Sequence, residues 1–332
     1  MSDGVNVNIQ QFPWLLPAWQ RLDQQMRAGQ LGHAQLFVGQ PGIGKRAMAS
    51  LMADKVLCLS RRDGLACGEC ASCLLLKAGT HPDFLLLEPE EEGKQIKIDQ
   101  IRQLTDFVNT TAQRSPAKAV VMGPVEQLNV NAANALLKSL EEPVTQVYLF
   151  LFSHRPSGVL PTIRSRCQQV SLAPPPFNEA LAWLRQLVDH EHAAQALLLA
   201  QGGPLKAIKL LDDQVVVGFM QFCQVLSDIA AGQVRPVEAY AKLKTLSPLM
   251  LADWFYLLAL DLLRRRQGGK LEHFASLAKL PLYDLPARHL QGFVDACQFA
   301  KTTISQPGNA NAQLLFENLL IDWLRLLRQS QA

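Results

Sequence analysis

Four cysteines that lie close together in the sequence have a spacing typical of a metal site. Cys58, Cys67, Cys70 and Cys73 form the pattern C-x8-C-x2-C-x2-C. Four thiolates complete the tetrahedral shell of a structural Zn²⁺, and two-residue spacers let consecutive cysteines turn toward one ion. An iron–sulfur cluster uses similar ligands, and a redox C-x-x-C pair or four unligated thiols are further alternatives. Because the segment is short and hydrophilic, we predict a structural zinc site.

A glycine-rich loop is the second candidate site. Gly39, Gly42, Gly44 and Lys45 lie in the run GQPGIGK, which fits G-x-x-x-x-G-K between an expected strand and an expected helix. In such loops the glycines let backbone N–H groups converge on an anion, and the helix N-terminus adds partial positive charge. The lysine reaches the β- and γ-phosphates. The run therefore indicates P-loop ancestry.

The groups that ATP hydrolysis needs beside this loop are missing. The residue after a P-loop lysine is normally Ser or Thr, which holds Mg²⁺, and here it is Arg46. The strand expected to end in acidic residues, 118–122, runs into Gly123-Pro124, and Glu126 lies beyond that end. Without these ligands, phosphoryl transfer loses most of its charge stabilisation. We therefore expect no productive ATP binding by this chain.

The elements that must position these residues alternate between short apolar runs and helical patterns. Such alternation predicts a doubly wound α/β domain with a parallel sheet and crossover helices. The expected strands are 34–38, 83–89, 118–123 and 147–152, and the expected helices are 45–57, 98–112 and 133–142. A last strand must end at the prolines of 173–176, because proline fixes φ and removes a backbone donor.

Beyond these prolines the pattern is helical to the end of the chain. The weakly patterned stretch 212–217 suggests a small helical unit followed by a larger one. We expect three domains: an α/β domain over 1–173 with the four-cysteine module at 58–73, a helical domain over 174–213 and a helical domain over 214–332. The final helix, about 311–328, is apolar around most of its circumference, which fits either a subunit contact or the centre of its own bundle.

Composition excludes several classes of protein. The 332 residues carry a net charge of only +3, too small for charge-driven nucleic-acid binding by the whole chain. The start has no basic region followed by an apolar stretch, so we expect a cytoplasmic protein. The longest apolar stretch, 249–263, is interrupted by Asp253 and Asp261 and is too short to span a membrane. The remaining cysteines, Cys167, Cys223 and Cys297, are expected to be buried thiols, and His81 a loop-packing residue.

Three further motifs occur in order along the first part of the chain. They are GTHPD at 79–83, ANALLKSLEEP at 133–143 and RSRC at 164–167. Together with the P-loop and the four cysteines, they resemble the clamp-loader subunits of bacterial DNA polymerase III, over nearly all of the chain before Pro176. The resemblance implies an AAA+ P-loop domain with a zinc-binding insertion, then a helical lid and a helical collar.

Two kinds of clamp-loader subunit share these motifs, an ATP-hydrolysing motor and a stator. The motor type has a P-loop threonine, an acidic pair after the third strand and a nucleotide-sensing arginine in the lid. This chain has Arg46, Gly123-Pro124 and Leu205 in their places, with Lys206 beside the last. The departures favour the stator. A motor with an atypical metal site, and a zinc-dependent scaffold or DNA-binding protein outside replication, are the alternatives.

The resemblance also implies a role for the S-R-C motif. In the family, its arginine projects into the nucleotide site of a neighbouring subunit, which assigns a catalytic contribution in trans to Arg166, with Ser165 and Cys167 beside it. A lone arginine at this place would instead be expected to pair with a surface carboxylate. The implied partners are the motor (gamma/tau) and delta subunits in a hetero-oligomeric ring, with the sliding clamp and primed DNA reached through the assembly.

Overall fold

The protein forms two compact units, which are described separately. The computed structural model describes residues 8–91, 93–188, 191–269, 271, 273–278, 280, 285, 287–305 and 311–329. The first unit comprises Met1–Ala180 and Gly202–Lys206, and the second comprises Leu181–Gln201 and Ala207–Ala332. Among the described residues, no helix is both long and apolar enough to cross a bilayer.

A parallel five-stranded sheet is the centre of the first unit. Its strand order is β2-β3-β4-β1-β5, and all four pairings are parallel. The strands are β1 (Ala34–Val38), β2 (Phe84–Leu87), β3 (Lys118–Met122), β4 (Val147–Ser153) and β5 (Gln168–Ser171). Every residue of β1 and β3 is buried, as expected of strands covered on both faces. The predicted doubly wound α/β domain is confirmed, and β5 ends before the prolines as expected.

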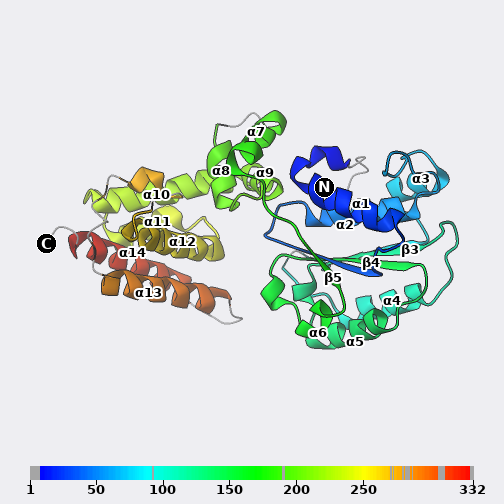
Figure 1. Cartoon of the computed structure of the whole chain (residues 1–332). Coiled ribbons are helices and arrows are strands. Elements are labelled where there is room, and N and C mark those ends of the chain that lie inside the picture. Colours follow the sequence, from blue (N-terminus) through cyan, green and yellow to red (C-terminus); the bar gives the residue numbers. More distant parts are fainter. Residues whose placement is uncertain are drawn as a thin grey trace. The chain divides into compact units, whose positions relative to one another are not determined.

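Helices cover both faces of this sheet (Figure 1). On one side lie α1 (Leu16–Arg27), α2 (Lys45–Leu57) and α3 (Ala71–Lys77); on the other lie α4 (Ile98–Val108), α5 (Val130–Glu141) and α6 (Pro161–Arg164). Short 3-10 helices connect them: η1 (Ile9–Gln11), η2 (Pro13–Leu15), η3 (Val125–Gln127) and η4 (Pro156–Gly158).

Alternate residues of the strands fill two separate layers of core. Leu36 and Val120 join the buried cluster that includes Leu104 of α4 and Leu136 of α5. Phe37 and Phe150 point to the opposite face, because successive side chains of a strand alternate, and their rings stack 6.4 Å apart. The P-loop follows the carboxyl end of β1, which lies between β4 and β5 in the sheet. Packing on both faces of the sheet therefore fixes where the loop begins.

After β5 the described chain is helical. The helices are α7 (Phe177–Leu187), α8 (Ala193–Leu199), α9 (Pro204–Asp212), α10 (Val215–Ala230), α11 (Pro236–Leu243), α12 (Pro248–Arg266), η5 (Ala275–Leu277), α13 (Ala287–Ser305) and α14 (Ala312–Gln329). The predicted all-α second part is confirmed.

The last helix packs into its own bundle through most of its apolar residues, while Leu314 is 55% exposed. α14 contacts α10, α11, α12 and α13. Trp323 is fully buried and donates its indole N–H to the carbonyl of Leu226, 3.1 Å away. Phe316 stacks on Phe255 of α12 with ring centroids 6.1 Å apart. Of the two explanations for its apolar circumference, burial within the bundle accounts for these residues.

Candidate functional site

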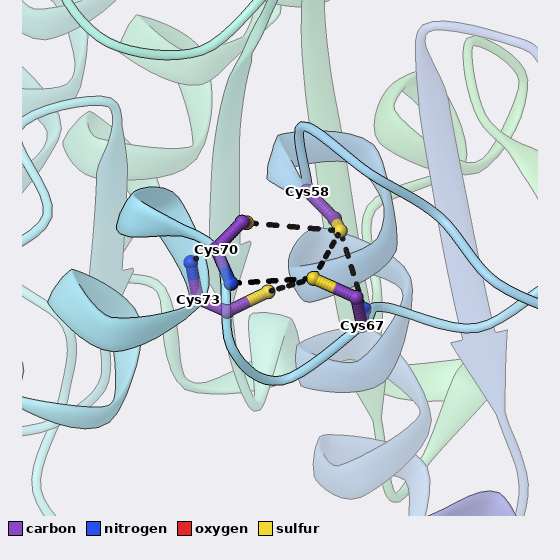
Figure 2. Close-up of side chains that lie close together, drawn as sticks. All are labelled: Cys58, Cys67, Cys70 and Cys73. Carbon is purple, nitrogen blue, oxygen red and sulfur yellow. Dashed lines mark hydrogen bonds between the residues drawn. The ribbon is translucent and has the colours of Figure 1, made fainter.

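The four predicted cysteines come together in one cluster (Figure 2). Cys58 follows the end of α2, and Cys67 lies in the loop between α2 and α3. Cys70 caps the start of α3, and Cys73 lies in the first turn of that helix. The Sγ atoms of Cys58 and Cys67 are 3.6 Å apart, those of Cys58 and Cys70 4.0 Å, and those of Cys67 and Cys73 3.9 Å.

These separations fit a single ion. Four sulfurs placed about 2.3 Å from one Zn²⁺ at the corners of a tetrahedron lie about 3.8 Å from one another. All four sulfurs here lie within 4.8 Å of one another. An iron–sulfur cluster instead distributes its cysteines over several iron atoms, which keeps the ligands farther apart. The geometry therefore favours one tetrahedral ion over a multi-iron cluster.

Backbone N–H groups prepare the sulfurs for a cation. The amide of Cys67 donates to Cys58 Sγ and the amide of Cys70 to Cys67 Sγ, both at 3.3 Å. Burial by itself would raise the pKa of Cys70, but N–H groups of Cys73 and Leu59 lower it to about 6. Burial instead raises the pKa of Cys58 and Cys73, so the four thiols differ in how readily they become thiolates, the form that binds metal.

A buried hydrogen-bond network attaches the cysteine module to the sheet. His81 Nε2 lies 2.7 Å from the hydroxyl of Ser72 and 3.1 Å from that of Ser115. Both hydroxyls donate to the carbonyl of Leu57 at the end of α2, at 2.8 and 2.9 Å. Burial lowers the pKa of His81, so its ring is neutral. His81 is thus a packing residue, as predicted, and is not among the metal-capable groups found in the described residues.

The acidic residue of the GTHPD motif holds a loop. Asp83 is fully buried, and its carboxylate accepts the backbone N–H groups of Gln113, Arg114 and Ser115 at 2.7 to 2.8 Å. These bonds outweigh burial and keep the pKa of Asp83 below its usual value. Sequence reasoning identified the motif without this function, which depends on residues about thirty positions away.

The P-loop lies between β1 and α2 as predicted, but its lysine turns back onto the loop. Lys45 is 2% exposed, and its ammonium donates to the carbonyl of Gln40. Burial lowers the pKa of Lys45 to about 8, and Glu126 opposes this in part. In a working P-loop this ammonium reaches the β- and γ-phosphates.

The position of the magnesium ligand is filled by an ion pair. Arg46 Nε lies 2.6 Å from Oε1 of Glu88, the residue directly after β2. The residue at the position of the Mg²⁺-binding hydroxyl is thus an arginine engaged with a carboxylate, which offers no oxygen ligand. Glu126 is also engaged, because its Oε1 accepts the N–H groups of His154 and Arg155 at 2.9 and 3.1 Å. The carboxylate left near the loop thus caps the segment after β4.

The start of α9 packs directly on the P-loop. The N–H of Leu205 donates to the carbonyl of Gly42 at 2.9 Å. A Cβ atom built on Gly42 would lie 2.7 Å from the backbone nitrogen of Lys206, so only glycine fits this approach. On another side, the indole of Trp14 donates to the carbonyl of Ile43 at 2.8 Å. The backbone of α9 and the side chain of Trp14 thus contact the loop, whose residues 39–42 remain half-buried.

The S-R-C motif follows α6, and its members have different surroundings. Cys167 is 9% exposed in the core beside Ile163, and burial raises its pKa to about 12. Ser165 donates its hydroxyl to the carbonyl of Thr162 at 3.1 Å. Arg166 is partly exposed, at 34% of its side chain. The buried side chain of Cys167 fixes the backbone of this segment, and with it the position of the Arg166 Cα atom.

Neighbouring oxygens orient the guanidinium of Arg166. Its Nη1 donates to the carbonyl of Thr162 at 2.9 Å and to Ser165 Oγ at 3.3 Å, and its Nη2 lies 2.6 Å from Oε1 of Glu141. Glu141 lies in the ANALLKSLEEP motif and is the last residue of α5. Its adjacency to the arginine had no signal in the sequence, because α5 and the S-R-C segment are distant along the chain.

Known proteins match the chain over nearly its full length. Residues 16–176 match the family described as "DNA polymerase III, delta subunit", and residues 219–325 match "DNA polymerase III, delta subunit, C terminal". The chain is 38% identical over 324 residues to DNA polymerase III subunit delta' of Pseudomonas aeruginosa, covering 95% of this chain and 98% of that protein. It is 33% identical over 320 residues to DNA polymerase III subunit delta' of Escherichia coli (strain K12), and the match covers 93% of this chain and 94% of that protein.

A solved structure supports the fold. A DNA polymerase III gamma subunit-related protein of Thermotoga maritima has a TM-score of 0.52 and 18% identity, and the match covers 94% of this chain and 99% of that one. The motifs, the parallel α/β unit followed by helices and the full-length relatives agree: the chain belongs to the delta-prime family, the clamp-loader subunits of bacterial DNA polymerase III.

Proposed function

We propose that this clamp-loader subunit is a stator that does not hydrolyse ATP and donates Arg166 to the ATP site of a neighbouring motor subunit. The observation that carries the proposal is the partly exposed Arg166, whose guanidinium is oriented by Thr162, Ser165 and Glu141, beside the buried Cys167. A guanidinium held near a γ-phosphate stabilises the charge that develops in the transition state. Core packing of the adjacent Cys167 holds the base of the side chain, and two of the five N–H donors of the guanidinium remain for a phosphoryl group of another chain.

The contacts of the chain's own P-loop support the proposal that this subunit does not hydrolyse ATP. Lys45 is bonded within the loop, Arg46 is paired with Glu88, and Gly42 is covered by the start of α9. A nucleotide would have to displace all of these contacts and would still find no hydroxyl for Mg²⁺. Gly39, Gly42, Gly44 and Lys45 thus form a P-loop shape without productive ATP binding.

Equilibrium binding of labelled ATP to the isolated chain tests this part. We expect no saturable binding at micromolar ATP with Mg²⁺, whereas an ATP-hydrolysing motor subunit measured in parallel binds. Arg46→Thr supplies the missing hydroxyl but leaves the Lys45 and Gly42 contacts in place, so we expect no turnover from this variant either. Micromolar binding with Mg²⁺-dependent turnover by the unchanged chain would instead support a motor subunit with an atypical metal site.

The other proposed parts concern assembly. Residues 174–213 act as a lid and residues 214–332 as a collar that joins motor (gamma/tau) and delta subunits into a ring. The assembly, rather than this chain alone, loads the sliding clamp onto primed DNA, which is consistent with a net charge of only +3. Because the chromosome is replicated in the bacterial cytoplasm, that is the proposed compartment.

Reconstitution tests the assembly. We expect this chain to copurify with motor and delta subunits of the same organism, and ATP-dependent clamp loading on primed DNA to require it. A mixture without the chain is the control. Failure to join these subunits, with each one folded, would remove the replication role and leave a zinc-dependent scaffold as the explanation.

We also assign Zn²⁺ to the four cysteines. Cys58, Cys67, Cys70 and Cys73 would hold it as a closed tetrahedral shell, which leaves no position for substrate and makes the ion structural. The ion would fix the loop between α2 and α3.

A further inference from the structure

We propose that Glu141 is a positioning residue for Arg166, fixing the direction in which its guanidinium points. The proposal rests on the trans role proposed above for Arg166 and adds a second residue of this chain to it. The observation behind it is the 2.6 Å ion pair between Arg166 Nη2 and Glu141 Oε1.

Both partners of this pair are attached to the same core. Glu141 is the last residue of α5, directly after Leu140, and Arg166 directly precedes Cys167. Leu140 and Cys167 belong to one buried cluster and are 2% and 9% exposed. The backbone positions of the pair are therefore held relative to each other by packing, before the charged groups interact.

Glu141 adds a constraint that the arginine's own segment does not supply. Thr162 and Ser165, which accept from Nη1, lie on the short segment that carries the arginine. Both of these contacts come from the arginine's own segment and would follow that segment if it moved. Glu141 comes from a different element and binds the other terminal nitrogen, so it connects the guanidinium to α5.

The arrangement orients the arginine without blocking it. A guanidinium has five N–H donors, and the contacts to Thr162, Ser165 and Glu141 use three of them. Glu141 is 48% exposed and Arg166 34% exposed, so water screens their attraction and the pair is weak. The carboxylate thus restricts the rotamers of a long side chain while donors remain for a phosphoryl group.

The test measures ATP hydrolysis by the reconstituted clamp loader on primed DNA. The rate that is lost on Arg166→Ala defines the Arg166-dependent rate. We expect Glu141→Ala to lower the kcat of the Arg166-dependent rate about two- to fivefold, with KM for ATP unchanged. This factor corresponds to the free energy typical of an exposed ion pair. Glu141→Gln keeps an acceptor oxygen and is expected to retain more of the rate than Glu141→Ala. Glu142→Ala, at the exposed neighbouring position, is the matched control and is expected to have no effect.

A double variant separates positioning from general structure. In the Arg166→Ala background, Glu141→Ala is expected to cause no further loss. An equal loss in both backgrounds would overturn the proposal, as would a kcat increase in Glu141→Ala, which would mean that the carboxylate sequesters the arginine. If Arg166→Ala slows ATP hydrolysis but Glu141→Ala leaves its rate unchanged, the positioning role alone is refuted. An unchanged Arg166→Ala would refute the trans role itself.

Discussion

Arg166→Ala is expected to slow ATP hydrolysis about 10³-fold at the motor site that receives this residue, the lower end of the range for arginine fingers. The physical reason is that the guanidinium neutralises charge that builds up on the γ-phosphoryl oxygens in the transition state. Motor sites that receive their arginine from another subunit continue to turn over, so the total rate falls by one site's share. The measurement is single-turnover ATP hydrolysis by the reconstituted assembly on primed DNA.

Two controls make this result specific. The ion pair of Arg166 with Glu141 is partly exposed, so Arg166→Ala is expected to change the free energy of unfolding by less than about 1 kcal/mol and to leave assembly intact. Arg164→Ala removes a nearby arginine that contacts the carbonyl of Pro156, and is expected to leave hydrolysis unchanged. Normal single-turnover kinetics of Arg166→Ala in an intact assembly would contradict the trans role.

Cys73→Ser is expected to abolish metal binding and to lower the free energy of unfolding by on the order of 4 kcal/mol. Three remaining thiolates cannot close the tetrahedral shell, and the loop between α2 and α3 loses the constraint that an ion bound by all four cysteines would provide. Elemental analysis is expected to find one zinc per wild-type chain and none in the variant. Urea denaturation with and without a chelator measures the stability difference.

A buried thiol outside the cluster provides the matched control. Cys223 is 7% exposed in the helical part, and burial raises its pKa to about 12. Cys223→Ala is expected to keep one zinc per chain and to show the same chelator sensitivity as the wild type. Iron in place of zinc would refute the assignment of the ion, and a wild-type chain with no metal would refute the site.

Local patterns in the sequence predicted most of the elements. The strands 34–38, 118–123 and 147–152 and the helix 45–57 occur nearly as expected, because buried strands and helices differ in length and apolar spacing. α5 begins earlier than expected, since Asn129 caps it through a bond to the N–H of Ala132. Periodicity does not reveal such an end.

Other elements were missed although they carry local signals. α1 was not predicted, yet it has Pro17 in its first turn and buries Trp19 and Leu22 on one face. α3 begins inside the cysteine module, where Cys70 both caps the helix and belongs to the metal cluster. A helix of only seven residues that begins between predicted metal ligands is too short for apolar periodicity to reveal it.

The sequence by itself determined the types of chemistry available: four clustered thiols, a P-loop with Arg46 after its lysine, and an arginine beside a buried cysteine. The tertiary structure alone decided the partners of these groups. It brought Glu88 to Arg46, 42 residues away, and Glu141 to Arg166. Residue type and spacing are local properties that a pattern records. Ion-pair partners depend on which elements the sheet places side by side, and that arrangement exists only once the chain has folded.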